Sequence, residues 1–329
     1  MKKQTRREFV RTLFIAGQAA VVSQFLPARL FAESSAVTSH SDFPPDALNF
    51  VLFGDWGRRG QTDQLHVAAQ MAGASGAIGA KFVVSVGDNF YESGVTSTED
   101  SHWRESFEEI YKASALQIPW KVILGNHDYY GNCDAQITYS KTSRRWQMPA
   151  RYFVETQQFG PDVTADFFYV DTTPMVKIYY EVKEETMRAN VRAQDVPAQI
   201  AWLKNALGAS KAQWKIVIGH HPIYSGNARG GTPELVDLIL PILYEHKVQA
   251  YFNGHDHDLQ HLVTRNLNLF CSGAGSIVSP KTMETERTKF VRNIPGFIAA
   301  SLQRDKLNVH MIDSSGSVLH TAVVPRDAA

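Results

Sequence analysis

The sequence predicts an α/β fold, and three observations lead to this prediction. Five short apolar runs rich in Val, Ile, Leu and Phe recur along the chain, helical patterns lie between several of them, and each run ends in Gly beside a charged or metal-capable side chain. Near-continuous apolar runs are typical of strands that are buried on both faces. Alternation of strands with helices is typical of α/β folds, which place their sites at the carboxyl ends of strands.

Each predicted element follows from its own local pattern. The apolar runs predict strands in "LNFVLFGDWG" (48–57), "KFVVSVGDNFY" (81–91), "WKVILGNHDYYGN" (120–132), "ADFFYVD" (165–171), "WKIVIGHHPIYS" (214–225) and "VQAYFNGHDHD" (248–258). Amphipathic patterns predict helices at 63–79, 197–210 and 233–246. Alternating segments at 266–276, 295–313 and 318–324 predict antiparallel strands. The charged stretch 172–195 is open to two interpretations, a lid over the site or a solvated surface loop.

Composition indicates a globular protein and excludes some partners. Hydrophobic residues make up 44% and charged residues 20% of the 329 residues, which is enough for a sizeable core. The formal net charge is zero, so nucleic acid is not expected as a partner. Two cysteines, Cys133 and Cys271, are too few for a disulfide framework. They could pair with each other or remain as buried free thiols.

The N-terminus has the layout of an export signal. Basic "MKKQTRREFVR" precedes the apolar stretch "TLFIAGQAAVVSQFL", and small residues surround Ala32. The Arg6–Arg7 pair resembles a twin-arginine signal, which would make the twin-arginine export machinery a partner. We therefore expect a signal peptide at 1–32, a single catalytic domain at 33–329, and a periplasmic or secreted protein. The apolar stretch is too short and too polar to be a stable membrane anchor. The alternative to an export signal is a basic amphipathic tail.

Polar side chains gather after the predicted strands. They are Asp55, Asp88, Tyr91, Asn126, His127, His220, His255 and His257. The set holds oxygen and imidazole donors and no thiolate, which suits hard or borderline metals and not a structural zinc cluster. Eight such groups exceed the needs of one metal, so we expect two metals that share a bridging carboxylate. Two-metal sites typically stabilise the attacking and leaving oxygens in phosphoryl transfer.

Five ordered motifs carry a family resemblance. "GDWG", "GDNFY", "GNHD", "VIGH" and "GHDH" resemble the five blocks of the calcineurin-like metallophosphoesterases, which implies an αββα fold of two packed mixed β-sheets flanked by helices. Within that superfamily, residues 47–280 resemble the purple acid phosphatases of the small tartrate-resistant type. Tyr91, three residues after Asp88, carries the distinction, since most of the superfamily lacks this tyrosine.

The resemblance implies an exported acid phosphatase that hydrolyses phosphate monoesters with a metal-activated hydroxide. It assigns Fe(III) to Asp55, Asp88, Tyr91 and His257, and a divalent Fe, Zn or Mn to Asp88, Asn126, His220 and His255. The chemistry agrees with this division, because phenolate and carboxylates stabilise the ferric state while amide and imidazole suit a divalent ion. The expected substrates are small-molecule phosphate esters.

The motifs also assign roles next to the metals. The resemblance implies that Asn126 and His127 bind substrate and that His127 helps to protonate the leaving alkoxide. The alternative for His127 is a histidine at a strand end that bonds to the backbone. The family has a second active-site histidine nine residues after the position of His220, but here that residue is Arg229. An arginine cannot act as a general acid, although it can clamp phosphate oxygens. Arg229 is therefore either a substrate-binding residue or a solvent-exposed loop residue.

Adjacent polar residues have to be separated from ligands. Of the neighbouring pair, His220 is expected to be the ligand, because strand alternation points His221 elsewhere. Asp128, Asp256 and Asn89 are expected to stabilise turns or to contact the ligands, and not to be ligands themselves. Two other functions stay open: a phosphodiesterase or nucleotidase of the same superfamily with a Zn, Mn or Fe pair, and a non-catalytic phosphate- or metal-binding protein.

Overall fold

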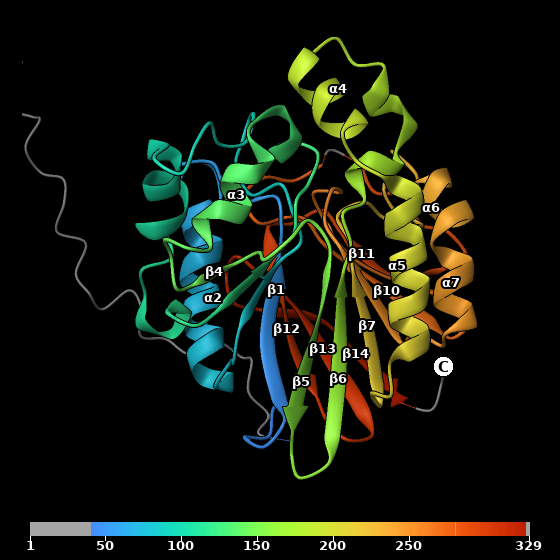
Figure 1. Ribbon diagram of the computed structural model, residues 1–329. Coiled ribbons are helices and arrows are strands. Elements are labelled where there is room, and N and C mark those ends of the chain that lie inside the picture. The colour runs from blue at the N-terminus through green and yellow to red at the C-terminus, as the bar shows by residue number, and fades with distance from the viewer. Residues whose placement is uncertain (1–40, 280, 327–329) are drawn as a thin grey trace, which may run out of the picture. The chain divides into compact units, whose positions relative to one another are not determined.

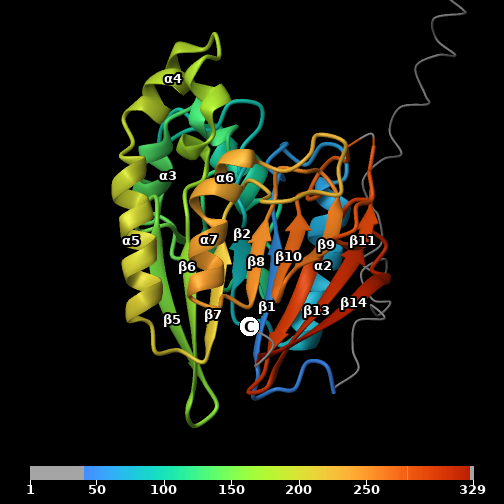
Figure 2. The ribbon, with the colours of Figure 1, turned by 90° about the vertical axis from the view of Figure 1, so that its right-hand side faces the viewer.

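Two mixed β-sheets of seven strands each pack face to face in the computed structural model, which describes residues 41–279 and 281–326 (Figures 1 and 2). The first sheet runs, from edge to edge, β14 (Val318–Pro325), β13 (Lys306–Asp313), β12 (Gly296–Leu302), β1 (Leu48–Phe53), β2 (Val83–Ser85), β3 (Trp120–Val122) and β4 (Trp146–Gln147). The second runs β11 (Thr288–Arg292), β9 (Leu259–Thr264), β10 (Leu267–Ser272), β8 (Ala250–Asn253), β7 (Trp214–Ile218), β6 (Val163–Tyr169) and β5 (Phe153–Phe159). The predicted two-sheet α/β fold is confirmed.

The first sheet is parallel in its β1–β4 half and antiparallel in the other half, whereas the second sheet is parallel in its centre and antiparallel at both margins. β1, β2, β3 and β4 pair in parallel in the first sheet, and β10, β8, β7 and β6 pair in parallel in the second. The predicted C-terminal strands β12, β13 and β14 pair antiparallel. Parallel neighbours end at the same edge of a sheet, so the loops that follow β1, β2, β3, β7 and β8 come together.

Helices flank both sheets. They are α2 (Gln64–Ile78), α3 (Cys133–Tyr139), α4 (Glu185–Arg192), α5 (Val196–Ala209), α6 (Pro233–Leu238) and α7 (Leu240–Glu245). Figure 1 shows α2 and α3 on one side and α5, α6 and α7 on the other, with α4 at the top. The helix predicted at 233–246 is two helices, α6 and α7. Pro241 at the start of α7 lacks the N–H that a continuous helix requires.

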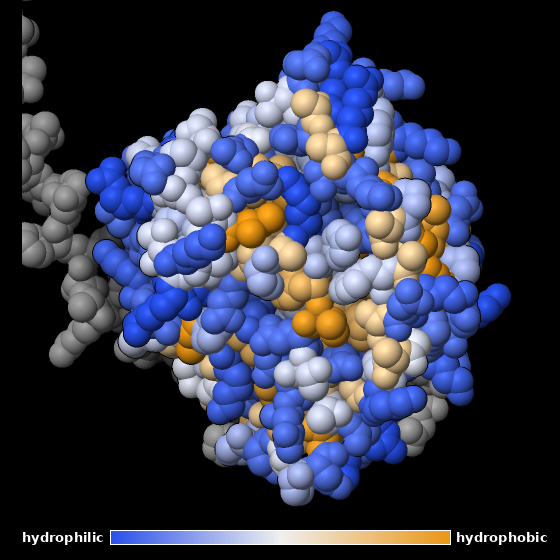
Figure 3. Space-filling model, in the orientation of Figure 1, coloured by the Kyte–Doolittle hydropathy of each residue, from blue (hydrophilic) through white to orange (hydrophobic). Residues whose placement is uncertain are grey.

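Burial on both faces explains the apolar runs. In β1, Phe50 and Leu52 point into the core between the sheets, while Val51 and Phe53 point into the core beneath the flanking helix α2. The second sheet packs against α5, α6 and α7 in a third core. The face of the molecule in Figure 3 is hydrophilic over most of its area, with hydrophobic residues gathered toward its centre. The side chains from Phe50 to Phe53 point alternately into two apolar cores, and this is why this run of β1 is apolar without interruption.

Three further predictions concern the cysteines, the signal peptide and a membrane anchor. Cys133 and Cys271 are both buried free thiols, so the two do not pair. The predicted signal peptide at 1–32 and its boundary lie outside the described residues. In the part of the chain that the structure describes, no helix has the length and apolar character to cross a bilayer.

The stretch 172–195 is folded, so its interpretation as a solvated loop is wrong. It forms helical turns at Thr173–Met175 and Lys177–Tyr180, followed by α4. Met187 and Val191 of α4 are fully buried. Asn190 donates hydrogen bonds to two carbonyls of the loop after β3, at 2.8 and 2.9 Å. Figure 1 places α4 at the end of the sheets where the parallel strands finish.

The core between the sheets should dominate stability. Phe50 is fully buried and packs against Phe82, Phe167 and Phe252, with ring centroids 5.1, 5.6 and 6.4 Å away. We predict that Phe50→Ala lowers the free energy of unfolding by about 3–5 kcal/mol, because it leaves a cavity. Chemical denaturation measures this loss. Val323→Ala, at a 58% exposed position, is the control and should change stability little, and equal losses in both variants would contradict the prediction.

Candidate metal centre

The seven predicted metal-binding residues all lie in loops that follow parallel strands. The loops after β1, β2, β3, β7 and β8 supply Asp55, Asp88, Tyr91, Asn126, His220, His255 and His257. Because these strands end at one edge of the packed sheets, residues 200 or more positions apart in the chain are in direct contact, as between Asp55 and the His255 N–H and between Asp55 and the His257 ring. The fold therefore builds the cluster from both sheets.

Four donors form the first group around the Tyr91 hydroxyl. This hydroxyl lies 2.9 Å from Asp88 Oδ2, 3.1 Å from Asp55 Oδ1 and 3.2 Å from His257 Nε2. His257 Nε2 is also 3.3 Å from Asp55 Oδ1. Asp55, Asp88 and Tyr91 are buried. Asp55, Asp88 and His257 have ligand atoms close enough to share one ion.

The second group gathers around Asn126. Its side-chain oxygen lies 2.8 Å from His255 Nδ1 and 3.1 Å from His220 Nε2. His220 Nε2 is in turn 3.5 Å from Asp88 Oδ1. Asp88 thus contacts the first group with one carboxylate oxygen and faces the second with the other. This is the geometry that a bridging carboxylate requires.

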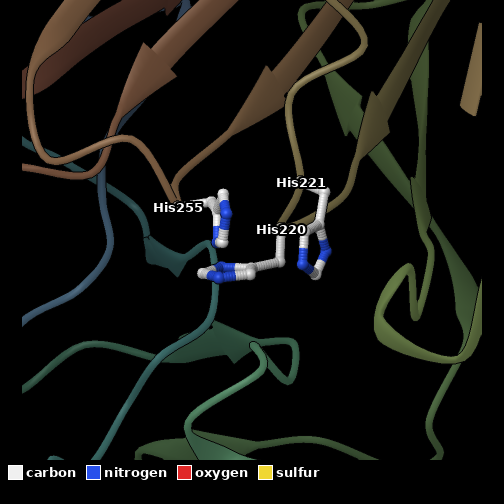
Figure 4. A group of neighbouring side chains, drawn as sticks. All are labelled: His220, His221 and His255. Atoms are coloured by element: carbon white, nitrogen blue, oxygen red, sulfur yellow. The ribbon is translucent and has the colours of Figure 1, made fainter. Parts of the chain in front are cut away.

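The adjacent side chains of His220 and His221 are oriented differently, with ring planes 89° apart (Figure 4). His220 Nδ1 donates to the Val86 carbonyl at 2.8 Å, which turns Nε2 toward the second group. Both ring nitrogens of His221 are within 2.9 Å of hydroxyls, those of Thr172 and Tyr179. His221 lies close enough to His220 and His255 to be a candidate ligand. Its hydrogen bonds support the sequence interpretation that His220 is the ligand.

Three of the predicted metal ligands have a left-handed backbone. The φ angles of Asp55, Asp88 and His255 are 61°, 50° and 67°. Such conformations cost on the order of 1–3 kcal/mol for residues other than glycine, and surrounding structure has to hold them. Gly125 permits the conformation at Asp88, since a Cβ on Gly125 would lie 2.3 Å from both the backbone nitrogen and Oδ1 of Asp88.

Asp128 holds two of the loops together. Its carboxylate accepts hydrogen bonds from Gly125 N–H at 2.8 Å, Asn89 N–H at 3.1 Å and Gln136 Nε2 at 2.8 Å. Burial raises the pKa of Asp128 to about 7, and the charge of Asp88 adds to the rise. The role predicted for Asp128, that of a turn-stabilising residue, therefore agrees with its contacts.

The predicted substrate-binding residues lie beside the metal ligands. His127 packs on the Tyr91 ring with centroids 4.4 Å apart, and its Nδ1 is 2.6 Å from the Glu92 carbonyl. Its backbone N–H donates to Asp88 at 2.7 Å. Arg229 is exposed, and its guanidinium donates to the His255 carbonyl at 3.4 Å. Arg229 thus lies at the edge of the second group.

Two contacts near the ligands are not evident from the sequence. Arg58 lies over the Tyr91 ring, with its guanidinium carbon 3.7 Å from the ring centroid. Tyr179, from the folded stretch 172–195, contacts His221 at 2.8 Å. The sequence "GDWGRRG" does not distinguish Arg58 from Arg59, and only the tertiary structure shows which of the two lies over Tyr91.

Burial and charge shift the pKa values of the ligands. Burial raises the pKa of Tyr91 well above its ordinary value, and the carboxylates of Asp55 and Asp88 raise it further. Burial by itself would lower the pKa of His220, but the Asp88 carboxylate outweighs it and raises that pKa to about 9. Burial also opposes ionisation of Asp88, but the imidazoles of His220 and His127 hold its pKa well below the ordinary value. The metal-free site therefore keeps protons that metal ions would displace.

The fold and the donor set define a metal-dependent phosphoesterase. A family model described as calcineurin-like phosphoesterase matches residues 48–259. The chain is 36% identical over 311 residues to Purple acid phosphatase 4 of Arabidopsis thaliana, covering 90% of this chain and 88% of that protein. It is 32% identical to Tartrate-resistant acid phosphatase type 5 of Sus scrofa, covering 96% of each. The chain belongs to the purple acid phosphatases, a family that implies a dinuclear metal centre.

Solved structures show the same fold. A structure titled "GAP50 the anchor in the inner membrane complex of Plasmodium" aligns with a TM-score of 0.76 at 25% identity, over 85% of this chain and 89% of that one. The purple acid phosphatase PPD1 from yellow lupin seeds aligns with a TM-score of 0.62 at 17% identity, over 85% and 54% of the two chains.

Metal binding should depend on pH. Because the pKa of His220 is about 9, its ring carries a proton at neutral pH that a metal ion must displace. We predict that the affinity of the metal-free protein for Zn²⁺ rises with pH and levels off above about pH 9. Competition with a chelator of known affinity at each pH measures this.

The ion pair between His220 and Asp88 should also affect the stability of the metal-free fold. Because the pKa of His220 is raised in the folded state, the pair stabilises the protein at pH values below the ordinary histidine pKa, and this stabilisation is lost as pH rises through about 9.

For the Zn²⁺ affinity, His220→Gln is the control variant and should bind Zn²⁺ more weakly, with a flatter pH dependence. A wild-type affinity that is constant between neutral pH and pH 9 would contradict the assignment.

Proposed function

We propose that the chain is an exported acid phosphatase that hydrolyses phosphate monoesters at a ferric–divalent metal centre. The observation that carries the proposal is the convergence of seven donors around Asp88, with the Tyr91 hydroxyl in the first group. A phenol among carboxylates is a hard anionic donor set that favours ferric iron, and the amide and imidazoles of the second group suit a divalent ion.

The donors present fit a metal pair. The ferric ion would be held by Asp55, Asp88, Tyr91 and His257, and the divalent Fe, Zn or Mn by Asp88, Asn126, His220 and His255. A bound pair of this kind supplies Lewis-acid polarisation of the ester and lowers the pKa of water, so that hydrolysis proceeds at acidic pH. In the described part of the chain, Asp55 and Asp88 are buried side by side with only histidines to balance their negative charges, which is further reason to expect cations here.

The contacts of His127 support a role in proton transfer. Its Nδ1 faces the Glu92 carbonyl at 2.6 Å, and a carbonyl only accepts hydrogen bonds, so Nδ1 carries the hydrogen. Nε2 is then the atom that gains and loses a proton. We assign to Nε2 the protonation of the leaving alkoxide, and to Asn126 the orientation of the phosphate beside the divalent ion.

Arg229 takes the place of a second histidine acid. The guanidinium lies beside His255 and has no proton to give at physiological pH. We assign it the binding of a phosphate oxygen, which is the chemistry its fork of N–H donors performs well. Esters with good leaving groups are then the better substrates, because only His127 remains to protonate the alkoxide.

Export is proposed from the sequence alone. The basic start, the Arg6–Arg7 pair and the apolar stretch before Ala32 support passage through the twin-arginine machinery to the periplasm or beyond. That machinery carries folded proteins, which suits a protein whose metals are inserted before transport.

The runner-up is a phosphodiesterase or nucleotidase, since the metal core of the superfamily is shared and loops set specificity. We predict that the purified wild-type protein contains iron, is coloured by tyrosinate-to-iron charge transfer, and has a higher kcat/KM for p-nitrophenyl phosphate than for bis(p-nitrophenyl) phosphate. Metal analysis, absorption spectra and the two assays across pH test these points.

Tyr91→Phe is the control for the colour, which it should abolish. An active, colourless wild-type protein with only zinc or manganese would overturn the iron assignment, and preference for the diester would favour the runner-up. Two bound metals without turnover of either ester would favour a binding protein.

The role of Arg229 is tested separately. We predict that Arg229→Ala raises KM for phosphate monoesters by roughly tenfold, because it removes a charge-assisted hydrogen bond, and leaves metal content unchanged. Arg229→His should instead improve turnover of esters with poor leaving groups. Arg265→Ala, in the turn between β9 and β10, is the control. Unchanged KM in Arg229→Ala would show that Arg229 is only a surface loop residue.

A further inference from the structure

Arg58 lies across the ring of Tyr91. It follows Asp55 by three residues in the loop after β1, and its guanidinium carbon is 3.7 Å from the ring centroid. This is well inside the ~6 Å range in which a cation is attracted to an aromatic face. The permanent charge of an arginine is therefore applied directly to the π-system of the one phenol among the predicted metal ligands.

Three loops hold the guanidinium in this place. Nη1 pairs with Glu92 Oε1 at 2.7 Å, and Nε donates to Ser276 Oγ at 3.2 Å. Ser276 Oγ in turn donates to the Asp55 carbonyl at 2.6 Å. The Arg58 side chain is only 15% exposed. Arg58 thus connects the loops after β1, β2 and β10, and its orientation over Tyr91 is fixed by hydrogen bonds at both sides of the guanidinium.

We propose that Arg58 is a positioning residue that tunes Tyr91 as a metal ligand, through the charge it places over the ring. The inference rests on the proposed function, in which the Tyr91 phenolate binds ferric iron. A nearby cation lowers the energy of the phenolate donor electrons and disfavours the higher oxidation state of the iron. Arg58 therefore raises both the energy of the charge-transfer band and the reduction potential of the iron.

The neighbouring arginine provides a matched control. Arg59 pairs with Glu105 at 3.0 Å, and its side chain is 46% exposed. The same substitution at Arg58 and Arg59 removes one positive charge from the same loop, but only the first removes it from the Tyr91 ring. A general effect of net charge on the protein would appear equally in both variants.

The test uses the full chain, stripped of metal and reloaded with ferric iron and Zn²⁺. Arg58→Gln should move the charge-transfer band to longer wavelength and lower the reduction potential, whereas Arg59→Gln should leave both in place. Arg58→Lys keeps the charge but loses the planar contact, so its shift should be smaller. Glu92→Gln removes the anion that offsets Arg58, so its band should move to shorter wavelength.

The outcomes separate this inference from the proposed function. A wild-type band that Arg58→Gln and Arg58→Lys leave unmoved overturns the role of Arg58 while the iron–tyrosinate assignment stands. A wild-type protein that forms no band on reloading overturns both. Thermal unfolding of the metal-free variants checks that each is folded. If Arg58→Gln is not, the opposite shifts of Arg58→Lys and Glu92→Gln decide, and the absence of both overturns the inference.

Discussion

The carboxylate of Asp88 is the contact on which the site depends. One oxygen lies 2.9 Å from the Tyr91 hydroxyl, while the other faces His220 and accepts the N–H of His127 at 2.7 Å. Among the described donors, Asp55 also reaches the second group, but only through the backbone N–H of His255, whereas Asp88 faces side chains of both groups. To point this carboxylate into the centre, the backbone takes a φ of 50°, and Gly125 has to approach without a Cβ. The parallel strands, the tight turns and the glycines after them all serve this placement.

Burying the carboxylates creates an electrostatic problem that the protein only partly solves. Asp55 and Asp88 are excluded from solvent, and uncompensated buried charge is strongly destabilising. In the metal-free site, the protonated His220 and the un-ionised Tyr91 offset some of this charge. Three of the predicted ligands also have left-handed backbones, so the cluster is a place where stability is given up for a preformed site. Two metal cations are the groups that would neutralise it.

Much of the fold and site follows from local sequence rules. Strands buried on both faces leave long apolar runs, and ligands after Gly at strand ends identify the edge where the site forms, as at Asp55 and Asp88. The contacts of Arg58 with Tyr91 and of Tyr179 with His221 join segments 33 and 42 residues apart, and no periodicity encodes them. The amphipathic pattern at 233–246 predicts one helix, although Pro241 indicates the break, because proline lacks the N–H donor that a helix interior needs.

The folded stretch 172–195 is packed into the core beside the candidate site, which distinguishes it from a mobile lid. Tyr179, Met187 and Val191 belong to the same core as the residues beneath α2. Exposing each side chain would cost roughly 1.5–3 kcal/mol, so opening the whole stretch would consume much of the stability of a typical domain. Tyr179 is also linked to His220, a predicted metal ligand, through hydrogen bonds. Tyr179 contacts His221, His221 contacts the Thr172 hydroxyl, and this hydroxyl accepts the His220 N–H. The stretch is therefore fixed in place, and its position is coupled to that of His220.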